Sequence, residues 1–248
     1  MSTHPPPHRL SKFPPWFSRW FGFRHSTPPK FPDYIVWLWS FIGAFCGISV
    51  IQAVFEQASY FVNREVPPIV ASYGASAVLI YGAIDAPLAQ PRALIGGHFL
   101  GALIGVIITK LFHLLHSEKR FEELVWLAGS LSCATSVVVM QMTATTHPPA
   151  GATALLAAVN PEIRKLGWYY LPVILLSSAL ALGVALITNN IQRRYPVYWH
   201  KPAVSIAVAP PVEEQEQEQD RKEEPDAIAT PSRANGLNKS ETTIANRV

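Results

Sequence analysis

The sequence predicts an all-α polytopic membrane protein with an internal two-fold repeat, four full transmembrane helices and two shorter helices. Residues 34–192 hold only 14 of the 37 charged residues, seven of each sign, so this stretch is about 9% charged. A soluble domain is usually about a quarter charged, because its surface must face water. The same stretch also divides into apolar segments long enough to cross a bilayer. A soluble globular protein is therefore excluded.

The chain divides into three parts. Residues 1–33 form a Pro-rich basic tail, whose first 32 residues carry five Lys or Arg and no acid. Residues 34–192 form the transmembrane domain, and residues 193–248 form an acidic and polar tail that we expect to be disordered. In the first tail, residues 16–24 combine Trp and Phe with Arg. This composition suits a short helix at the lipid headgroups, and a disordered segment is the alternative.

Four segments have the length of a full span. A helix rises 1.5 Å per residue, so roughly 20 residues cross ~30 Å of hydrocarbon. Trp and Tyr residues, among them Tyr170, stand near the ends of these segments, where aromatic belts form at the membrane surfaces. The four predicted spans are residues 34–55, 93–115, 124–142 and 168–191.

Two further apolar segments, residues 66–84 and 148–159, are rich in Gly, Ala and Ser, and each contains a proline pair near its start. An offset of 77 residues aligns residues 74–83 with residues 151–160 and also aligns the spans that follow, whereas the preceding spans align at an offset of 87. Together these matches predict a repeat of residues 34–115 and 124–191. Duplicated halves with short helices in corresponding positions are typical of transporters, and those helices mark the binding site.

The sequence allows two alternatives for the number of times that the chain crosses the membrane. If both short helices cross, there are six spans, and of the Lys and Arg up to residue 201 nine lie on the side of the termini against six on the other side. If both re-enter, there are four spans, and the counts are eleven against four. The excess of cytoplasmic Lys and Arg in membrane proteins modestly favours re-entry, whereas the length of residues 66–84 favours crossing. In either case we expect both termini on the cytosolic side of a membrane whose identity is left open.

The most distinctive motif lies between Thr143 and Ala158. Pro148 and Pro149 suit the first turn of a helix, with Thr146 or His147 as its cap. The positive end of such a helix suits a small anion, and residues 66–84 offer a second helix start of this kind. We therefore expect paired helix N-termini to form a substrate site from Thr145, Thr146, His147, Pro148, Pro149, Gly151, Thr153, Ser72, Gly74 and Ser76.

Two ionisable residues near or inside the spans are further candidates. His98 either relays a proton, since histidine titrates near neutral pH, or is a neutral histidine satisfied by a backbone carbonyl. Arg92 either gathers anions at a vestibule or extends to the lipid headgroups.

Other residues are interpreted structurally. Gly97, Gly101 and Gly105 recur at four-residue spacing, which predicts close helix packing. Cys46 and Cys133 are interpreted as small buried hydrophobes. His113 and His116 lack further nearby ligands, so we expect no metal site, and no cofactor is predicted.

Three blocks of this sequence resemble a known family, the membrane proteins named for their His-Pro-Pro motif. His147 to Ala154 (HPPAGATA) is similar to the signature itself, and Tyr73 to Val78 (YGASAV) and Pro87 to His98 (PLAQPR with GGH) are similar to its other recurrent blocks. The resemblance covers about residues 60–190. It implies about four spans and a transport role, and it makes nitrite the leading substrate, because plastid and cyanobacterial members are associated with nitrite movement.

We therefore expect a small-anion transporter or channel that works in a lipid bilayer, with a homo-oligomer left open. The alternative is a non-transporting membrane scaffold that recruits partners through its acidic tail. An enzyme is not expected, because no hydrolase, zinc-protease or phosphate-loop motif is present. A nucleic-acid partner is not expected either, since the basic tail is first of all an orientation signal.

Overall fold

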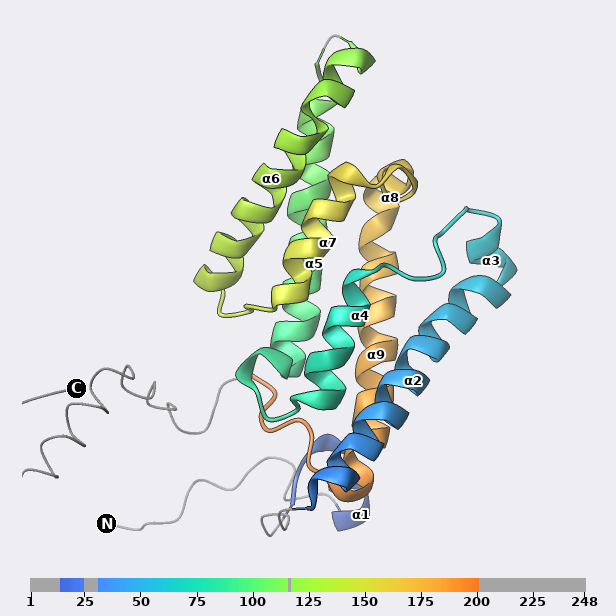
Figure 1. Ribbon diagram of the computed structural model, residues 1–248, viewed down its shortest axis with the longest axis vertical. Helices are drawn as coiled ribbons and strands as arrows, with labels where there is room; N and C mark the ends of the chain where they lie inside the picture. Colours follow the sequence, from blue (N-terminus) through green and yellow to red (C-terminus); the bar gives the residue numbers. More distant parts are fainter. Residues whose placement is uncertain (1–13, 25–30, 116, 201–248) are drawn as a thin grey trace, which may run out of the picture. The chain divides into compact units, whose positions relative to one another are not determined.

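Helices form the regular structure of this protein in the computed structural model, which describes residues 14–24, 31–115 and 117–200 (Figure 1). Within these ranges no strand occurs, so the all-α prediction is confirmed. Four helical stretches of 22 to 32 residues are long and apolar enough to cross a membrane, which confirms the four predicted full spans. They are α2 (Asp33–Gln57), α5 (Pro91–Phe112), α6 (Glu118–Met142) and the continuous stretch of α8 (Pro161–Leu166), η5 (Gly167–Tyr169) and α9 (Tyr170–Gln192).

Two half-length helical elements lie between the long ones, in addition to the single turns α3 (Ser59–Val62) and η4 (Pro87–Ala89). The first is α4 (Ser72–Ala77), continued by the π-helical turn η3 (Val78–Gly82), and the second is α7 (Pro148–Val159). A 12-residue helix such as α7 rises about 18 Å, which is well short of the ~30 Å of hydrocarbon. The proline pair does not start the first element as expected, because α4 begins only at Ser72, after an irregular stretch that follows Pro68.

The short elements run against the long helices that they connect. In Figure 1, α2 and α5 both run upward, and α4 with η3 leads the chain downward between them. Likewise α6 and α9 run downward, and α7 leads the chain back upward. A re-entrant segment would return to the end where it started, so this arrangement agrees with the six-crossing alternative, in which two of the crossings contain half-length helices.

Each half of the domain thus contains a long, a short and a long element. The two short elements differ, because the first combines a six-residue helix with a π turn and the second is a 12-residue helix. The internal repeat stays a prediction.

α5 and α7 pack closely at the centre of the bundle. A Cβ atom added to Gly101 would lie 2.5 Å from the carbonyl oxygen of Ala150, and one added to Gly105 would lie 2.5 Å from that of Ala154. Such distances leave no room for a side chain, so the glycines allow the two backbones to touch. The packing role predicted for these glycines is therefore confirmed.

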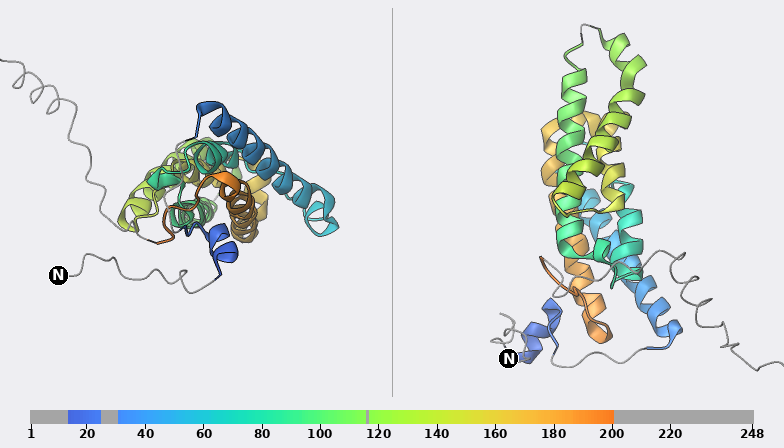
Figure 2. Two further views of the ribbon diagram at one scale, coloured as in Figure 1. Left: turned by 90° about the horizontal axis from the view of Figure 1, so that it is seen from below. Right: turned by 90° about the vertical axis from the view of Figure 1, so that its left-hand side faces the viewer.

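The outer helices present apolar side chains on their outward faces. Figure 2 shows α2 and α6 on opposite sides of the bundle, with α5, α7 and α9 between them. Large apolar side chains on these faces remain uncovered, and a bilayer is the solvent that suits them. They include Trp37, Phe41 and Phe45 on α2 and Trp126, Leu131 and Val138 on α6.

Residues before and after the predicted domain pack onto the lower end of the bundle. α1 (Pro15–Ser18) and the 3-10 turn η2 (Arg19–Phe21) lie where a surface helix was expected, and Trp16 is 70% exposed. The Arg19 Nε donates to the carbonyl of Asn190 (3.1 Å), and the Tyr195 hydroxyl donates to the carbonyl of Ala89 (2.7 Å). The packed part of the chain is therefore wider than residues 34–192, and the predicted tail from residue 201 lies outside the described residues.

Arginines at this end cap the last turn of α9. Arg19 and Arg24 both donate to the Asn190 carbonyl, and the Arg194 Nε donates to the Gly22 carbonyl (2.9 Å). Carbonyls in the last turn of a helix lack intrahelical partners, and cations are favourable there. Burial, followed by the neighbouring charges of Arg19 and Arg194, lowers the pKa of Arg24.

Candidate functional site

A buried cluster of five polar side chains lies where α4, α5 and α7 meet. Ser72 and Ser76 come from α4, His98 from α5, and His147 and Thr153 from the start and the second turn of α7. Ser72 is 3% exposed and the other four are fully buried. All five were predicted from the sequence as site residues, and the fold brings them together. We call them the polar cluster.

The polar cluster is one continuous chain of hydrogen bonds. Ser72 Oγ lies 2.8 Å from Thr153 Oγ1, which lies 2.7 Å from His98 Nδ1. His98 Nε2 lies 2.7 Å from Ser76 Oγ, which lies 2.9 Å from His147 Nε2. The chain ends where His147 Nδ1 lies 2.8 Å from the carbonyl oxygen of Leu88.

The Leu88 carbonyl determines the direction of this chain when both histidines are neutral. A carbonyl only accepts, so His147 Nδ1 carries the hydrogen and His147 Nε2 accepts from the Ser76 hydroxyl. The Ser76 oxygen then accepts from His98 Nε2, which leaves His98 Nδ1 to accept from Thr153. Ser72 in turn donates to Thr153. Each hydrogen is used once, and both tautomers follow from the network.

Two tyrosines hold the polar cluster in place. The Tyr73 ring stacks on the His98 ring, with centroids 4.5 Å apart, and its hydroxyl lies 2.7 Å from both the carbonyl of Ile174 and the hydroxyl of Ser178. The Tyr170 hydroxyl donates to the carbonyl of Thr153 (3.2 Å). Both tyrosines are fully buried, so the expectation that Tyr170 belongs to an aromatic belt was wrong. The sequence signal for Tyr73 was its place in the block shared with Gly74 and Ser76.

The start of α7 offers few free donors. Pro148 and Pro149 have no N–H, and the N–H of Ala150 donates to the carbonyl of His147 (2.9 Å). Ser72, the first residue of α4, contacts Thr153 in the second turn of α7 and not the start of that helix. The polar groups in this region are therefore mainly those of side chains and not the unpaired N–H groups of two facing helix starts.

The remaining predicted site residues lie outside the polar cluster. Gly74 is exposed with nothing within 4 Å of an added Cβ, and an added Cβ on Gly151 would lie 3.6 Å from the sulfur of Cys133 on α6. Thr145 is buried beside Thr143, with their hydroxyls 2.8 Å apart. Thr146 is partly buried, whereas of the proline pair Pro148 is exposed and Pro149 buried. A substrate contact by any of these stays a prediction.

Arg92 lies at the lower end of the bundle. Its guanidinium donates to the carbonyls of Thr143 (2.6 Å) and His200 (3.1 Å). Arg92 thereby ties the connection between α6 and α7 to the last described residues, and its vestibule role stays a prediction.

No group of three potential metal ligands comes together among the described residues. His113 stacks on Phe121, with ring centroids 3.9 Å apart, and His116 lies outside the described residues. No carboxylate, lysine or arginine belongs to the polar cluster, so with neutral histidines it has no formal charge.

Long apolar helices around a closed polar cluster define a polytopic helical membrane protein. A family model described as HPP, transmembrane region, matches residues 29–196, which is about two thirds of the sequence. The chain belongs to this family, and the predicted resemblance is confirmed.

Two relatives support the same class. Both are described as transmembrane proteins of Dictyostelium discoideum, and each is 37% identical over 187 residues, or 74% of this chain. The chain spans 63% of the length of one and 57% of the other. No solved structure matches this chain significantly.

Proposed function

We propose that this protein moves a small anion across a membrane, with nitrite as the leading substrate, and that the polar cluster is its central site. The observation that carries the proposal is the five-membered hydrogen-bond chain, closed off from solvent between the two half-length helices. Polar groups deep in a membrane protein are costly and commonly mark transport pathways. Short helices in the middle of a transporter typically surround its binding site.

A site without fixed charge suits an anion that must leave again. The hydroxyls of Ser72, Ser76 and Thr153 and the ring N–H groups of both histidines are donors that can turn toward an anion. The positive end of α7 lies beside His147 and adds attraction without a formal charge. Strong binding by a buried lysine or arginine would instead hold the anion and slow its release.

Proton binding offers a means of coupling. If His147 takes a proton at Nε2, it becomes a donor on both sides and no longer accepts from Ser76. The Ser76 hydroxyl has a second acceptor, because the carbonyl of Ser72 lies 3.3 Å away. Protonation would thus turn the Ser76 hydroxyl toward the Ser72 carbonyl, and the Ser76 oxygen would then face two N–H donors, those of His98 and His147. An anion there would balance the added charge, so anion and proton would move together.

The element that opens the site is α4 in this proposal. It is short, it follows the irregular stretch before Ser72, and it ends in a π turn, a feature that often occurs at functional sites. A shift of α4 would break the Ser72–Thr153 contact and both contacts of Ser76.

The orientation proposed with this function places the lower end of the bundle in the cytosol. Counted up to residue 201, nine Lys or Arg belong to that end of the bundle and the adjoining tail segments, against six for the upper end. The side with more Lys and Arg is normally cytosolic.

The test is flux of nitrite, nitrate, formate and chloride into liposomes that contain the purified full-length protein. We expect His147→Ala and Ser76→Ala to reduce nitrite flux at least about tenfold, since each removes a hydrogen bond to a buried partner worth ~1–3 kcal/mol. The matched control is Ser130→Ala, because Ser130 lies exposed on α6 and its hydroxyl donates to the carbonyl of Trp126 in the same helix. Flux equal to that of empty liposomes for all four anions would refute transport.

Two further measurements test proton coupling and the scaffold alternative separately from transport itself. Nitrite flux that does not change with the pH gradient would refute proton coupling but not transport. A variant lacking residues 205–248 tests the scaffold alternative, because a transporter keeps its flux without that tail.

A further inference from the structure

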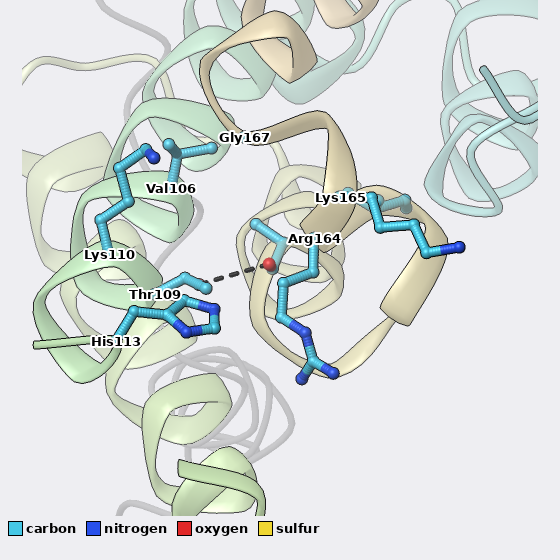
Figure 3. Close-up of a pocket in the computed structure, with 9 residues that line it drawn as sticks. Val106, Thr109, Lys110, His113, Arg164, Lys165 and Gly167 are labelled. Atoms are coloured by element: carbon cyan, nitrogen blue, oxygen red, sulfur yellow. Dashed lines mark hydrogen bonds between the residues drawn. The ribbon is translucent and has the colours of Figure 1, made fainter. Parts of the chain in front are cut away.

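A second polar site lies at the upper end of the bundle, apart from the polar cluster. It is a cavity of about 160 Å³ between the end of α5, the end of α7 and α8 (Figure 3). This volume is well above the ~10–15 Å³ that one water molecule needs. Its lining residues are Val106, Thr109, Lys110, His113, Ala157, Ile163, Arg164, Lys165 and Gly167. We call it the basic cavity.

The ionisable residues of this cavity are all basic. Lys110, His113, Arg164 and Lys165 line it, and no acidic residue does. Arg164 has a carboxylate partner, Glu122, at 2.7 Å, whereas Lys110 and Lys165 form no ion pair with any residue that the structure describes. The cavity therefore holds more positive than negative charge.

Two of the basic side chains are held in position by Phe121. The Arg164 guanidinium lies 4.9 Å from the centre of the Phe121 ring, and the His113 ring stacks on the same ring. The Arg164 side chain also donates to the carbonyl of Ala158 (3.3 Å). A binding site whose donors are fixed in advance loses less conformational entropy when its ligand binds.

Lys110 is positioned against the turn after α8. Gly167 has a φ of 53°, a conformation that side chains disfavour, and Lys110 Nζ lies 3.7 Å from the place that a Cβ on Gly167 would occupy. Figure 3 shows the Lys110 amine beside Gly167, the His113 ring next to Arg164, and Lys165 extending away from them.

A neighbouring cavity differs from the basic cavity because acidic residues also line it. It has a volume of about 460 Å³ and is lined by Arg64, Glu65, Glu162, Lys165 and Leu166. Two acids balance its two basic residues, so it has no preference for an anion.

We propose that the basic cavity binds a tetrahedral oxyanion of the phosphate type. Lysine and arginine are the usual partners of such groups, and their hydrogen bonds to phosphate oxygens are charge-assisted. The anion comes either from the phosphate of a phospholipid headgroup or from free inorganic phosphate or sulfate. The proposed oxyanion site is independent of the proposed transport function, because its test measures anion binding and not anion flux.

The experiment uses the purified full-length protein in detergent. One arm titrates delipidated protein with inorganic phosphate and with sulfate by calorimetry. The other arm measures by native mass spectrometry how much phosphatidic acid stays bound. Lys110→Gln should weaken binding about fivefold, which corresponds to the ~1 kcal/mol of a partly exposed ion pair. Because Lys110 is exposed, the variant should fold, and an unchanged melting temperature checks this.

The matched control is Lys119→Gln, which removes the same charge from an exposed position at the same end of the bundle and outside the cavity lining. Binding of inorganic phosphate that depends on Lys110 supports a soluble oxyanion. Lys110-dependent retention of phosphatidic acid alone supports a lipid headgroup. Equal weakening by Lys110→Gln and Lys119→Gln, or no binding in either arm, would overturn the proposal.

Discussion

The polar cluster and the basic cavity differ in the charge of their polar side chains and in their access to solvent. In the cluster, five neutral side chains satisfy one another and are sealed from solvent. In the cavity, cationic side chains stand at an end of the bundle, and two of them have no ion pair with any described residue. A charge deep in a membrane protein carries a large desolvation penalty, whereas water at the end of the bundle solvates it. Depth in the bundle thus determines which chemistry each site can use.

Both sites lie along the contact between α5 and α7. A substitution at one point of that contact should therefore show whether the two sites respond differently. Gly101→Ala brings a Cβ within 2.5 Å of a backbone oxygen of α7, and we expect it to cost about 1–3 kcal/mol by overpacking. The melting temperature should fall and nitrite flux with it, while phosphate binding at the basic cavity should persist in the folded fraction. Gly183→Ala on α9 is the control, because nothing lies within 4 Å of its added Cβ. An equal loss of stability in both variants would contradict this account of the packing.

A smaller change affects the polar cluster alone. Tyr73→Phe removes a hydroxyl that contacts Ile174 and Ser178 but keeps the ring that stacks on His98. We expect a loss of about 1 kcal/mol of stability, as for one buried hydrogen bond, measured by thermal unfolding in detergent. Phosphate affinity should stay unchanged. Tyr34→Phe, at an exposed tyrosine of α2, should have no effect, and a similar loss there would show that the hydroxyl of Tyr73 is not special.

The smallest expected effect concerns the basic cavity alone. Glu122→Gln removes the carboxylate that pairs with Arg164 on a partly exposed surface, so stability should change by less than about 0.5 kcal/mol. Phosphate binding by calorimetry should become about twofold tighter, because the positive charge of the cavity is no longer offset. The sign is opposite to that expected for Lys110→Gln. Weaker binding in Glu122→Gln would mean that the ion pair positions Arg164 more than it neutralises it.

The long spans and the residues of the polar cluster could be predicted from the sequence for different reasons. The long spans follow from runs of apolar residues, which is a local property. Ser72, Ser76, His98, His147 and Thr153 stood out because hydroxyls and histidines are unusual in such runs. Their order in one hydrogen-bond chain could not be predicted, because Ser76 and His147 are 71 positions apart in the sequence.

The expectations that differed from the structure depended on contacts between distant segments. The start of α4 was expected directly after a proline pair, and Tyr170 at a membrane surface. Tyr170 stands near the end of a span in the sequence, yet α7 covers it, since its hydroxyl reaches Thr153. The basic cavity was missed because Lys110 and Arg164 lie far apart along the chain and line one cavity only in the folded protein.

The sequence by itself determined the class of protein, the four long spans and the His-Pro-Pro motif, because hydrophobicity and proline chemistry act over short stretches of chain. Only the tertiary structure decided that the short helices run back between parallel long helices and that the polar side chains form a single hydrogen-bond chain. It also decided that charge gathers in one cavity at the upper end. The physical reason is that burial, partners and solvation belong to the packed helices, and no segment carries them alone.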